Sequence, residues 1–292
     1  MAKLRNLRAQ LAFNKDMSNI INVLRGIAAS EFGRLQRERK KFDEYASYLE
    51  RLFQILDVSG FSHFFLDEID LPTNIILVTS DTGFLGKLNV SIVNTALGQY
   101  KENDYLTVIG RQGERYITER VKEYKFFPGI SDYISPVEVE RIKKYIINEV
   151  KEKHVNKTVI VYPEFVSFAV QRVQSLDLLP CRHLFTARPV DQIQEAEEER
   201  LIVEPSFNRV VEYLVHLRIN HVIYNIFWDS KLSEWAARVM HLEGSSDEVK
   251  RQAKVVRLSY FRAVHEQSDK SIREIFASTS ALRRSQWNKY ES

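Results

Sequence analysis

The chain has 292 residues, enough for one large domain or two ordinary ones, and its 44% hydrophobic content is ample for a buried core. Its 42 basic and 39 acidic residues leave a net charge of +3, so the overall balance identifies no class of partner. A single cysteine, Cys181, excludes an internal disulfide framework and is typical of a reducing compartment. We expect no membrane insertion, because no apolar run approaches the ~20 residues of a membrane span and no signal peptide is recognisable.

The N-terminal segment has the pattern of a long helix. Apolar side chains recur in heptads, and no proline occurs before Pro72. This spacing predicts a helix of roughly 55 residues and about 80 Å with one apolar stripe. The repeating positions are Leu7, Asn14, Ile21, Ala28, Leu35, Phe42, Leu49 and Leu56, with companions at Leu4, Leu11, Met17, Leu24, Tyr45 and Leu52.

Between Leu71 and Pro205 the pattern changes to short apolar runs that alternate with helical segments. The first three runs are typical of buried parallel strands, and a fourth alternates like an antiparallel strand. Strands are expected at 74–79, 106–109, 158–162 and 166–173, and helices at 90–100 and 136–153. This alternation predicts a Rossmann-like α/β domain.

The C-terminal segment is helical again after Pro205, which suits the first turn of a helix. From Leu217 to Ala263 a mostly apolar seam steps by three or four residues, so a helix from about Ser206 to Leu282 would be on the order of 110 Å long. The two long helices pair most economically as an antiparallel coiled coil. The alternative is an ordinary bundle of broken helices, because glycine costs about 1 kcal/mol in a helix and could mark breaks at Gly26, Gly33 and Gly244.

The predicted fold is therefore of the α/β class, with a long antiparallel coiled coil of N- and C-terminal helices and an inserted Rossmann-like α/β domain. We place the N-terminal helix at 1–60, the α/β domain at 71–205, and the C-terminal helix and tail at 206–292.

Motifs for catalysis, nucleotide binding and metal binding are missing from the sequence. The glycines of Gly83–Lys87 are separated by two residues rather than the four of a phosphate-binding loop, and Leu88 stands where such a loop has Ser or Thr. Gly110–Gly113 completes no dinucleotide fingerprint, and the histidines and Cys181 have no zinc spacing. We expect no catalytic residues, no cofactor and no metal.

Two charge clusters are each interpreted as a solvated face or as a docking surface for the opposite charge. The basic run carries no nucleic-acid recognition motif, so we expect no nucleic-acid partner. The clusters comprise Arg34, Arg37, Arg39, Lys40 and Lys41, and Glu195, Glu197, Glu198 and Glu199.

Several stretches resemble, in chain order, motifs of the gamma subunits of F-type ATP synthases. Ser80–Asn89 resembles S-D-x-G-L-x-G-x-[FY]-N, and Gly110–Gly113 resembles the G-[RK]-x-G turn. Tyr162–Pro180 is similar to Y-N-x-F-x-S followed by L-L-P. Ser230–Met240 resembles S-x-A-S-E-[HQ]-A-A-R-M, and Leu258–Ala263 resembles L-x-Y-N-[RK]-A. The matches extend over nearly the whole chain.

The resemblance implies a non-catalytic shaft of a rotary motor that couples ATP synthesis or hydrolysis to proton or sodium translocation. It implies that the coiled coil lies inside a ring of alpha and beta subunits, and that the α/β domain binds the epsilon subunit and the c-subunit ring. It also implies a peripheral position at the cytoplasmic face of a bacterial inner membrane, held through partners only. The rivals are a gamma-like rotor or scaffold of a specialised ATPase complex not devoted to ATP synthesis, and a stand-alone α/β enzyme with helical arms.

Matching positions imply subunit-coupling contacts, although several depart from the family pattern. Val264 and His265 replace the usual Arg-Gln pair, Ser271 replaces a glutamate, and Thr82 replaces a basic residue. Leu24–Ser30 resembles gamma subunits of the sodium-linked second ATPases of some bacteria. The expected contact residues are Leu24, Arg25, Thr82, Leu85, Lys87, Arg262, His265, Ser271 and Glu274.

Overall fold

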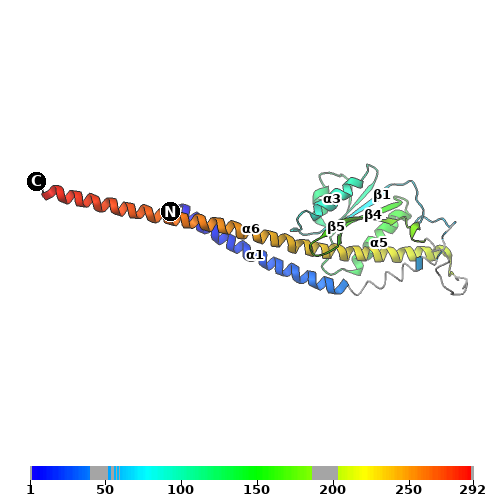
Figure 1. The fold of residues 1–292 in the computed structure, drawn as a ribbon. Coiled ribbons are helices and arrows are strands. Elements are labelled where there is room, and N and C mark those ends of the chain that lie inside the picture. Colours follow the sequence, from blue (N-terminus) through cyan, green and yellow to red (C-terminus); the bar gives the residue numbers. More distant parts are fainter. Residues whose placement is uncertain are drawn as a thin grey trace. The chain divides into compact units, whose positions relative to one another are not determined.

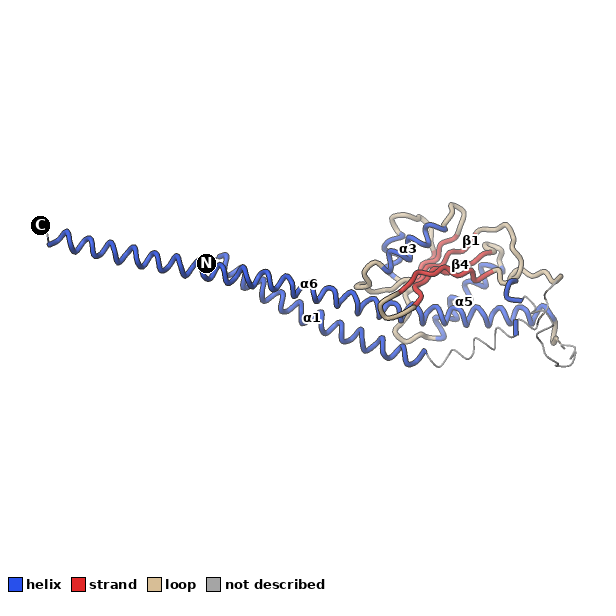
Figure 2. Tube along the Cα trace, viewed as in Figure 1, coloured by secondary structure: helices blue, strands red, loops and turns tan. Residues whose placement is uncertain are grey.

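Two long helices and a five-stranded sheet dominate the fold (Figures 1 and 2). The computed structural model of the chain describes residues 2–39, 52–53, 56, 58, 60–185 and 203–290. Predicted positions such as Phe42, Tyr45, Leu49, Lys40 and Lys41, and the acidic stretch at 195–199, lie outside these residues. The elements are α1 (Ala2–Arg39), β1 (Thr73–Val78), α3 (Leu88–Gln99), β2 (Tyr105–Ile109), α4 (Arg111–Ile117), β3 (Lys125–Phe127), α5 (Pro136–Lys151), β4 (Lys157–Phe165), β5 (Gln171–Leu179), η1 (Arg182–Phe185) and α6 (Phe207–Tyr290).

The chain divides into two compact units, of which the first comprises Met1–Ile27 and Leu242–Ser292. In this unit α1 and α6 run antiparallel: Lys3 Nζ lies 3.3 Å from Glu266, and Arg25 lies 3.9 Å from Glu243. Most of the predicted seam is turned inward, with Asn14, Ile21, Leu242, Ser246 and Ala263 all buried. Leu24, predicted as a companion position of the seam, is instead exposed. Heptad spacing therefore predicted the pairing of these helices correctly.

Neither long helix is interrupted at its glycines. Gly26 and Gly33 lie within the 38 residues of α1, and Gly244 lies within the 84 residues of α6. The alternative of helices broken at these positions is therefore wrong. Helix propensity is a weak preference of about 1 kcal/mol per glycine, and the packing of a long apolar seam outweighs it.

The second unit, Ala28–His241, contains the sheet, in the order β3-β2-β1-β4-β5. The first four strands are mutually parallel, and β5 pairs with β4 in the antiparallel direction. One face of β1 packs Ile75 and Leu77 against α3, and the other face packs Ile76 and Val78 in the core that contains α5 and the first turns of α6. Burial on both faces explains the continuous apolar runs of these strands. The predicted Rossmann-like α/β class is confirmed.

Two local predictions in this unit were displaced. The antiparallel strand begins at Gln171 rather than at Val166, because Ser167 and Val170 exchange backbone hydrogen bonds of 3.0 and 3.2 Å that close the β4–β5 turn. Gly110–Gly113 is not only a turn: Gly110, at φ +100°, is the N-cap of α4. The alternating pattern therefore predicted that a strand exists here, but it did not predict at which residue the β4–β5 hairpin turns and β5 begins.

Both long helices also contribute to the second unit. Ala28, Phe32 and Leu35 of α1 pack on an α6 surface formed by Trp228, Leu232, Trp235, Ala236 and Val239. At the end of α1, Arg39 forms a 2.6 Å ion pair with Asp229. Among the described residues, no helix combines the length and the apolarity needed to cross a membrane.

Candidate functional site

The carboxyl ends of β1 and β4 mark the place where an open α/β sheet would ordinarily bind a ligand. From β1 the chain continues through α3 to β2 on one side, whereas β4, reached through α5, lies on the other side. Doubly wound sheets bind ligands in the crevice that such a reversal of strand order creates. A ligand site in this fold is therefore expected in this crevice.

Helix α6 fills this crevice. The remaining cavity has a volume of about 10 Å³, and Thr79, Ser80, Pro163, Ser230 and Glu234 are among the residues that line it. Ser233, which is fully buried, donates a 3.2 Å hydrogen bond from its Oγ to the carbonyl oxygen of Pro163 in β4. A single water needs roughly 10–15 Å³. The crevice has no room for a nucleotide, and its contents are side chains of α6.

A buried ion-pair network forms the centre of this contact. The Glu234 carboxylate lies 2.7 Å from Arg238 Nη2 and 3.1 Å from Lys231 Nζ, and its side chain is only 9% exposed. Thr82, in the loop after β1, accepts a 2.5 Å hydrogen bond from Arg238 and donates one of 3.3 Å to Glu234. The Arg238 guanidinium also lies 4.2 Å from the centroid of the Trp235 ring. One carboxylate thus compensates two buried cations, which would be costly to leave unpaired.

The loop before α5 extends this network to both long helices. Lys231 of α6 lies 3.3 Å from the Asp132 carboxylate. From α1, Arg34 donates a 2.9 Å hydrogen bond to the Asp132 carbonyl oxygen and lies 4.6 Å from the Tyr133 ring centroid. Asp132 therefore attaches the loop to both long helices, through its carboxylate to α6 and through its carbonyl oxygen to α1.

Close backbone approaches shape the loop after β1. Asp81 accepts hydrogen bonds from the backbone N–H groups of Arg111 (2.9 Å) and Gly129 (3.0 Å). A Cβ at Gly129 would stand 2.6 Å from the Asp81 carboxyl carbon. Glycine is required there because the strand ends converge on this carboxylate, not because the backbone binds a phosphate.

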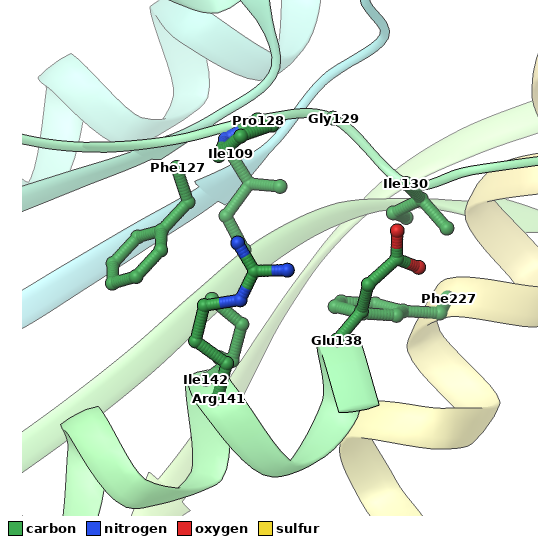
Figure 3. Close-up of a pocket in the computed structure, with 9 residues that line it drawn as sticks. All are labelled: Ile109, Phe127, Pro128, Gly129, Ile130, Glu138, Arg141, Ile142 and Phe227. Carbon is green, nitrogen blue, oxygen red and sulfur yellow. The ribbon is translucent and has the colours of Figure 1, made fainter. Parts of the chain in front are cut away.

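A second cavity, of about 20 Å³, lies beneath the segment that follows β3 (Figure 3). Its polar lining includes Arg141 and Glu138, both of α5. Glu138 is already engaged: it accepts a 3.0 Å hydrogen bond from Ser131 Oγ and completes the capping box of α5 with Ser135. The space suits one or two waters rather than a substrate. Among the described residues no cluster of acidic, histidine or cysteine side chains has the arrangement of a metal site.

The structure brings three of the predicted contact residues together in one loop. Thr82 is bound to α6 as described, Lys87 is exposed, and Leu85 is buried at 6% exposure, so its side chain is turned away from the surface. The others lie in the first unit, Leu24 and Arg25 on α1 and the remainder on α6. Apart from Arg25, which is half-buried beside Glu243, these are exposed: Leu24, Arg262, His265, Ser271 and Glu274.

Four residues of this network were not predicted as functional residues from the sequence: Lys231, Glu234, Arg238 and Asp132. A usable signal was present: Lys231, Glu234 and Arg238 are spaced by three and four residues within an otherwise apolar and small stretch of a helix. Charges at that spacing on a buried helical face must be paired with one another. The contribution of Asp132, roughly a hundred residues earlier, had no comparable signal.

A family model described as ATP synthase matches residues 3–282 of the chain. The chain belongs to this family. Its relatives are ATP synthase gamma chains: that of an Exiguobacterium species is 26% identical over 97% of this chain and 100% of its own length. The gamma chain of Cytophaga hutchinsonii is 24% identical over 97% of this chain and 99% of its own length.

Solved ATP synthase structures share the fold. A chain of the Euglena gracilis mitochondrial enzyme aligns with 98% of this chain and 96% of its own length, at a TM-score of 0.72 and 14% identity. A central-stalk chain from Tetrahymena thermophila aligns with 78% of this chain and 99% of its own, at a TM-score of 0.63 and 18% identity. The prediction of a gamma subunit of the F-type ATP synthase central stalk, itself non-catalytic, is confirmed. A specialised scaffold and a stand-alone enzyme are not favoured.

Proposed function

We propose that this chain rotates inside a ring of alpha and beta subunits and couples ATP turnover in the ring to proton or sodium translocation through a c-subunit ring. The α/β domain binds the epsilon subunit and the c-subunit ring. The chain is held at the cytoplasmic face of the membrane through these partners. The predicted domain division assigns ring contacts to the segments 1–60 and 206–292, and base contacts to 71–205.

The end of α6 is the observation that carries this proposal. Lys3, near the start of α1, pairs with Glu266, and every side chain from His265 to Ser280 is exposed. Among them are Ile272, Ile275 and Phe276, the last 70% exposed. Apolar side chains three and four residues apart on one helix face form a stripe that needs a partner surface. A ring that encloses this end of α6 provides such a surface.

A second apolar stripe on α1 supports the same arrangement. Phe13, Ile20, Val23 and Ile27 are exposed, although Asn14 and Ile21 of the heptad seam are buried. Their spacing of seven, three and four residues places them along one side of the helix. Coiled-coil pairing with α6 thus leaves apolar surface on α1 for a further partner.

Within this arrangement, the nine predicted contact residues are proposed to face the ring or the base. Leu24, Arg25, Arg262, His265, Ser271 and Glu274 belong to the paired helices and are assigned to the ring. Thr82 and Lys87 lie in the loop after β1, and this loop is assigned to the contacts with the ring or the base. Leu85 is buried, so it is assigned a supporting role in the same loop. Because Val264 and His265 replace the usual Arg-Gln pair, we expect compensating changes in the beta subunit that meets them.

Reconstitution tests this proposal. The purified chain, mixed with the alpha and beta subunits of the same organism, should form a complex whose steady-state ATPase activity depends on it. Deleting residues 265–292 should weaken assembly, because it removes the exposed stripe, whereas an Ile69→Ser change in the α/β domain should leave ring assembly intact. A chain that does not co-purify with such a ring, or a deletion that assembles and turns over normally, contradicts the proposal.

A further inference from the structure

The loop Thr82–Lys87 has a backbone that its sequence does not favour. Phe84 has φ +65° although it is a bulky L-residue, and its side chain is 60% exposed. The left-handed region is rarely occupied by aromatic residues, and such outliers gather at functional sites where surrounding contacts hold them. Leu85, the next residue, is buried. The loop thus turns Leu85 inward and leaves Phe84 outward.

The contacts that hold this loop come mainly from α6. Arg238 donates to Thr82 Oγ1 at 2.5 Å and approaches the Gly83 carbonyl oxygen at 3.5 Å. Glu234 accepts from the Thr82 hydroxyl at 3.3 Å and from Arg238 at 2.7 Å. Just before the loop, Ser80 Oγ donates to the Thr82 carbonyl oxygen at 2.7 Å. The Phe84 ring also lies 6.4 Å from the His241 ring of α6. The hydrogen bonds from α6 to Thr82 and Gly83 named here come from Arg238 and Glu234, which pair with each other.

We propose that Glu234 is a positioning residue that holds the loop Thr82–Lys87 on α6 and so presents Phe84 and Lys87 to a neighbouring subunit of the complex. Its carboxylate fixes Arg238 over the loop and compensates Lys231 at the same time. The proposal rests on the proposed rotor function for the identity of the neighbour, but not for the conformation of the loop. Rotation of α6 then carries this loop with it.

Glu234→Gln isolates the charge from the shape of the side chain. Glutamine keeps the volume and one acceptor oxygen, but it leaves the buried Arg238 without a compensating charge. Lys231 keeps the Asp132 carboxylate, 3.3 Å away. An unpaired Arg238 moves toward solvent because its desolvation is no longer offset. Arg238 then leaves Thr82, and the strained conformation at Phe84 relaxes. The two core clusters on the faces of the sheet include none of Lys231, Glu234 and Arg238, so they keep their packing.

Proteolysis of the full-length chain tests the conformation of the loop. Chymotrypsin should cut after Phe84 about 10-fold faster in Glu234→Gln than in the wild type, because local opening controls cleavage. Cleavage after Phe168, in the β4–β5 turn, should be unchanged and serves as the internal reference. Glu119→Gln, which removes an exposed carboxylate of the same unit, should alter neither site. Equal acceleration at both sites, or no acceleration at Phe84, overturns the proposal.

Reconstituted complexes in vesicles test the consequence. Glu234→Gln and Phe84→Ala should each lower ATP-driven ion transport per ATP hydrolysed by a similar factor of about two or more, and the double variant should be no worse than either, since both changes remove the same presented side chain. Glu119→Gln should retain the wild-type ratio. A loss with Phe84→Ala but not with Glu234→Gln overturns the positioning role. If the wild-type chain does not assemble, the rotor function fails, whereas the cleavage result in the free chain stands.

Discussion

The backbone N–H of Phe65 donates a 3.2 Å hydrogen bond to Nδ1 of His63, and this fixes the protonation state of a buried imidazole. Since Nδ1 accepts, the ring is the neutral tautomer that carries its proton on Nε2. Phe64 stacks on the ring with a centroid distance of 4.1 Å. His216 belongs to the same cluster, because its ring lies edge-on to Phe65 at 5.8 Å.

This arrangement predicts that the stability of the fold depends on pH. Burial lowers the pKa of both His63 and His216, and Lys151 lowers both further, against the opposing effect of Glu212. A lowered pKa means that below about pH 6.5 the unfolded chain binds more protons than the folded one. Stability should be full above that pH and decline as the pH falls below it, by up to about 1.4 kcal/mol per pH unit for each histidine. Urea unfolding between about pH 5 and 8 measures this slope.

His63→Asn is the matched variant, since an Asn oxygen can accept the same backbone hydrogen bond without titrating. In this variant, the free energy of unfolding should fall less steeply with decreasing pH in the acidic range. An unchanged slope would show that His63 does not contribute to it, and a decline above pH 7 would have the wrong sign for buried neutral histidines.

The Asp67–Arg182 contact predicts a stability loss from one amide substitution. Asp67 accepts hydrogen bonds from Ser62 Oγ (2.6 Å) and the His63 backbone (2.9 Å), and it also pairs with Arg182. The Ser62 hydroxyl, the Arg182 side chain and the His63 N–H hold the pKa of the Asp67 carboxyl below its usual value. Asp67→Asn should lower the free energy of unfolding by about 1–3 kcal/mol at neutral pH. The loss in free energy of unfolding should be small at an acidic pH where the wild-type Asp67 carboxyl is protonated. An equal loss at neutral and at acidic pH would point to packing instead.

A pair of glycine substitutions should have opposite signs. Gly129→Ala places a Cβ 2.6 Å from the Asp81 carboxyl carbon, so it should destabilise the chain by more than about 1 kcal/mol. Gly98 lies in α3 with no atom near its would-be Cβ, and Gly98→Ala should stabilise by up to about 1 kcal/mol. Thermal unfolding of the two variants checks both signs, and a neutral Gly129→Ala would mean that the Asp81 loop yields easily.

Cys181 should be chemically silent in the folded protein. Burial raises the pKa of its thiol to about 12, and the side chain is 1% exposed. Because thiolate is the reactive form, iodoacetamide at about pH 8 should leave the native chain unmodified and should label it fully in denaturant. Intact-mass measurement distinguishes the two states. Rapid labelling of the native chain would indicate that the segment around Cys181 opens readily.

Periodicity was enough to establish the long helices, because burial of one stripe repeats with the helical turn. The predicted seam positions, which step by three or four residues from Leu217 to Ala263, are all buried or half-buried in the structure. They include the polar residues His221 and Ser246. The parallel strands were equally predictable, since both faces of β1 are covered and its last four residues, Ile75 to Val78, are therefore all apolar. The long helices and the parallel strands could be predicted because both depend on residues that are close together in the sequence.

The crevice and its network depend on residues that are distant in the chain. Glu234 meets Thr82 across 152 positions, and Arg34 meets the Asp132 carbonyl across 98. No local pattern specifies which loop a buried carboxylate will contact, so only the packed structure shows that α6 occupies the place of a ligand. The family motifs located the participating segments, whereas the pairing of their charges was decided by the requirement that ions removed from water be compensated within the fold.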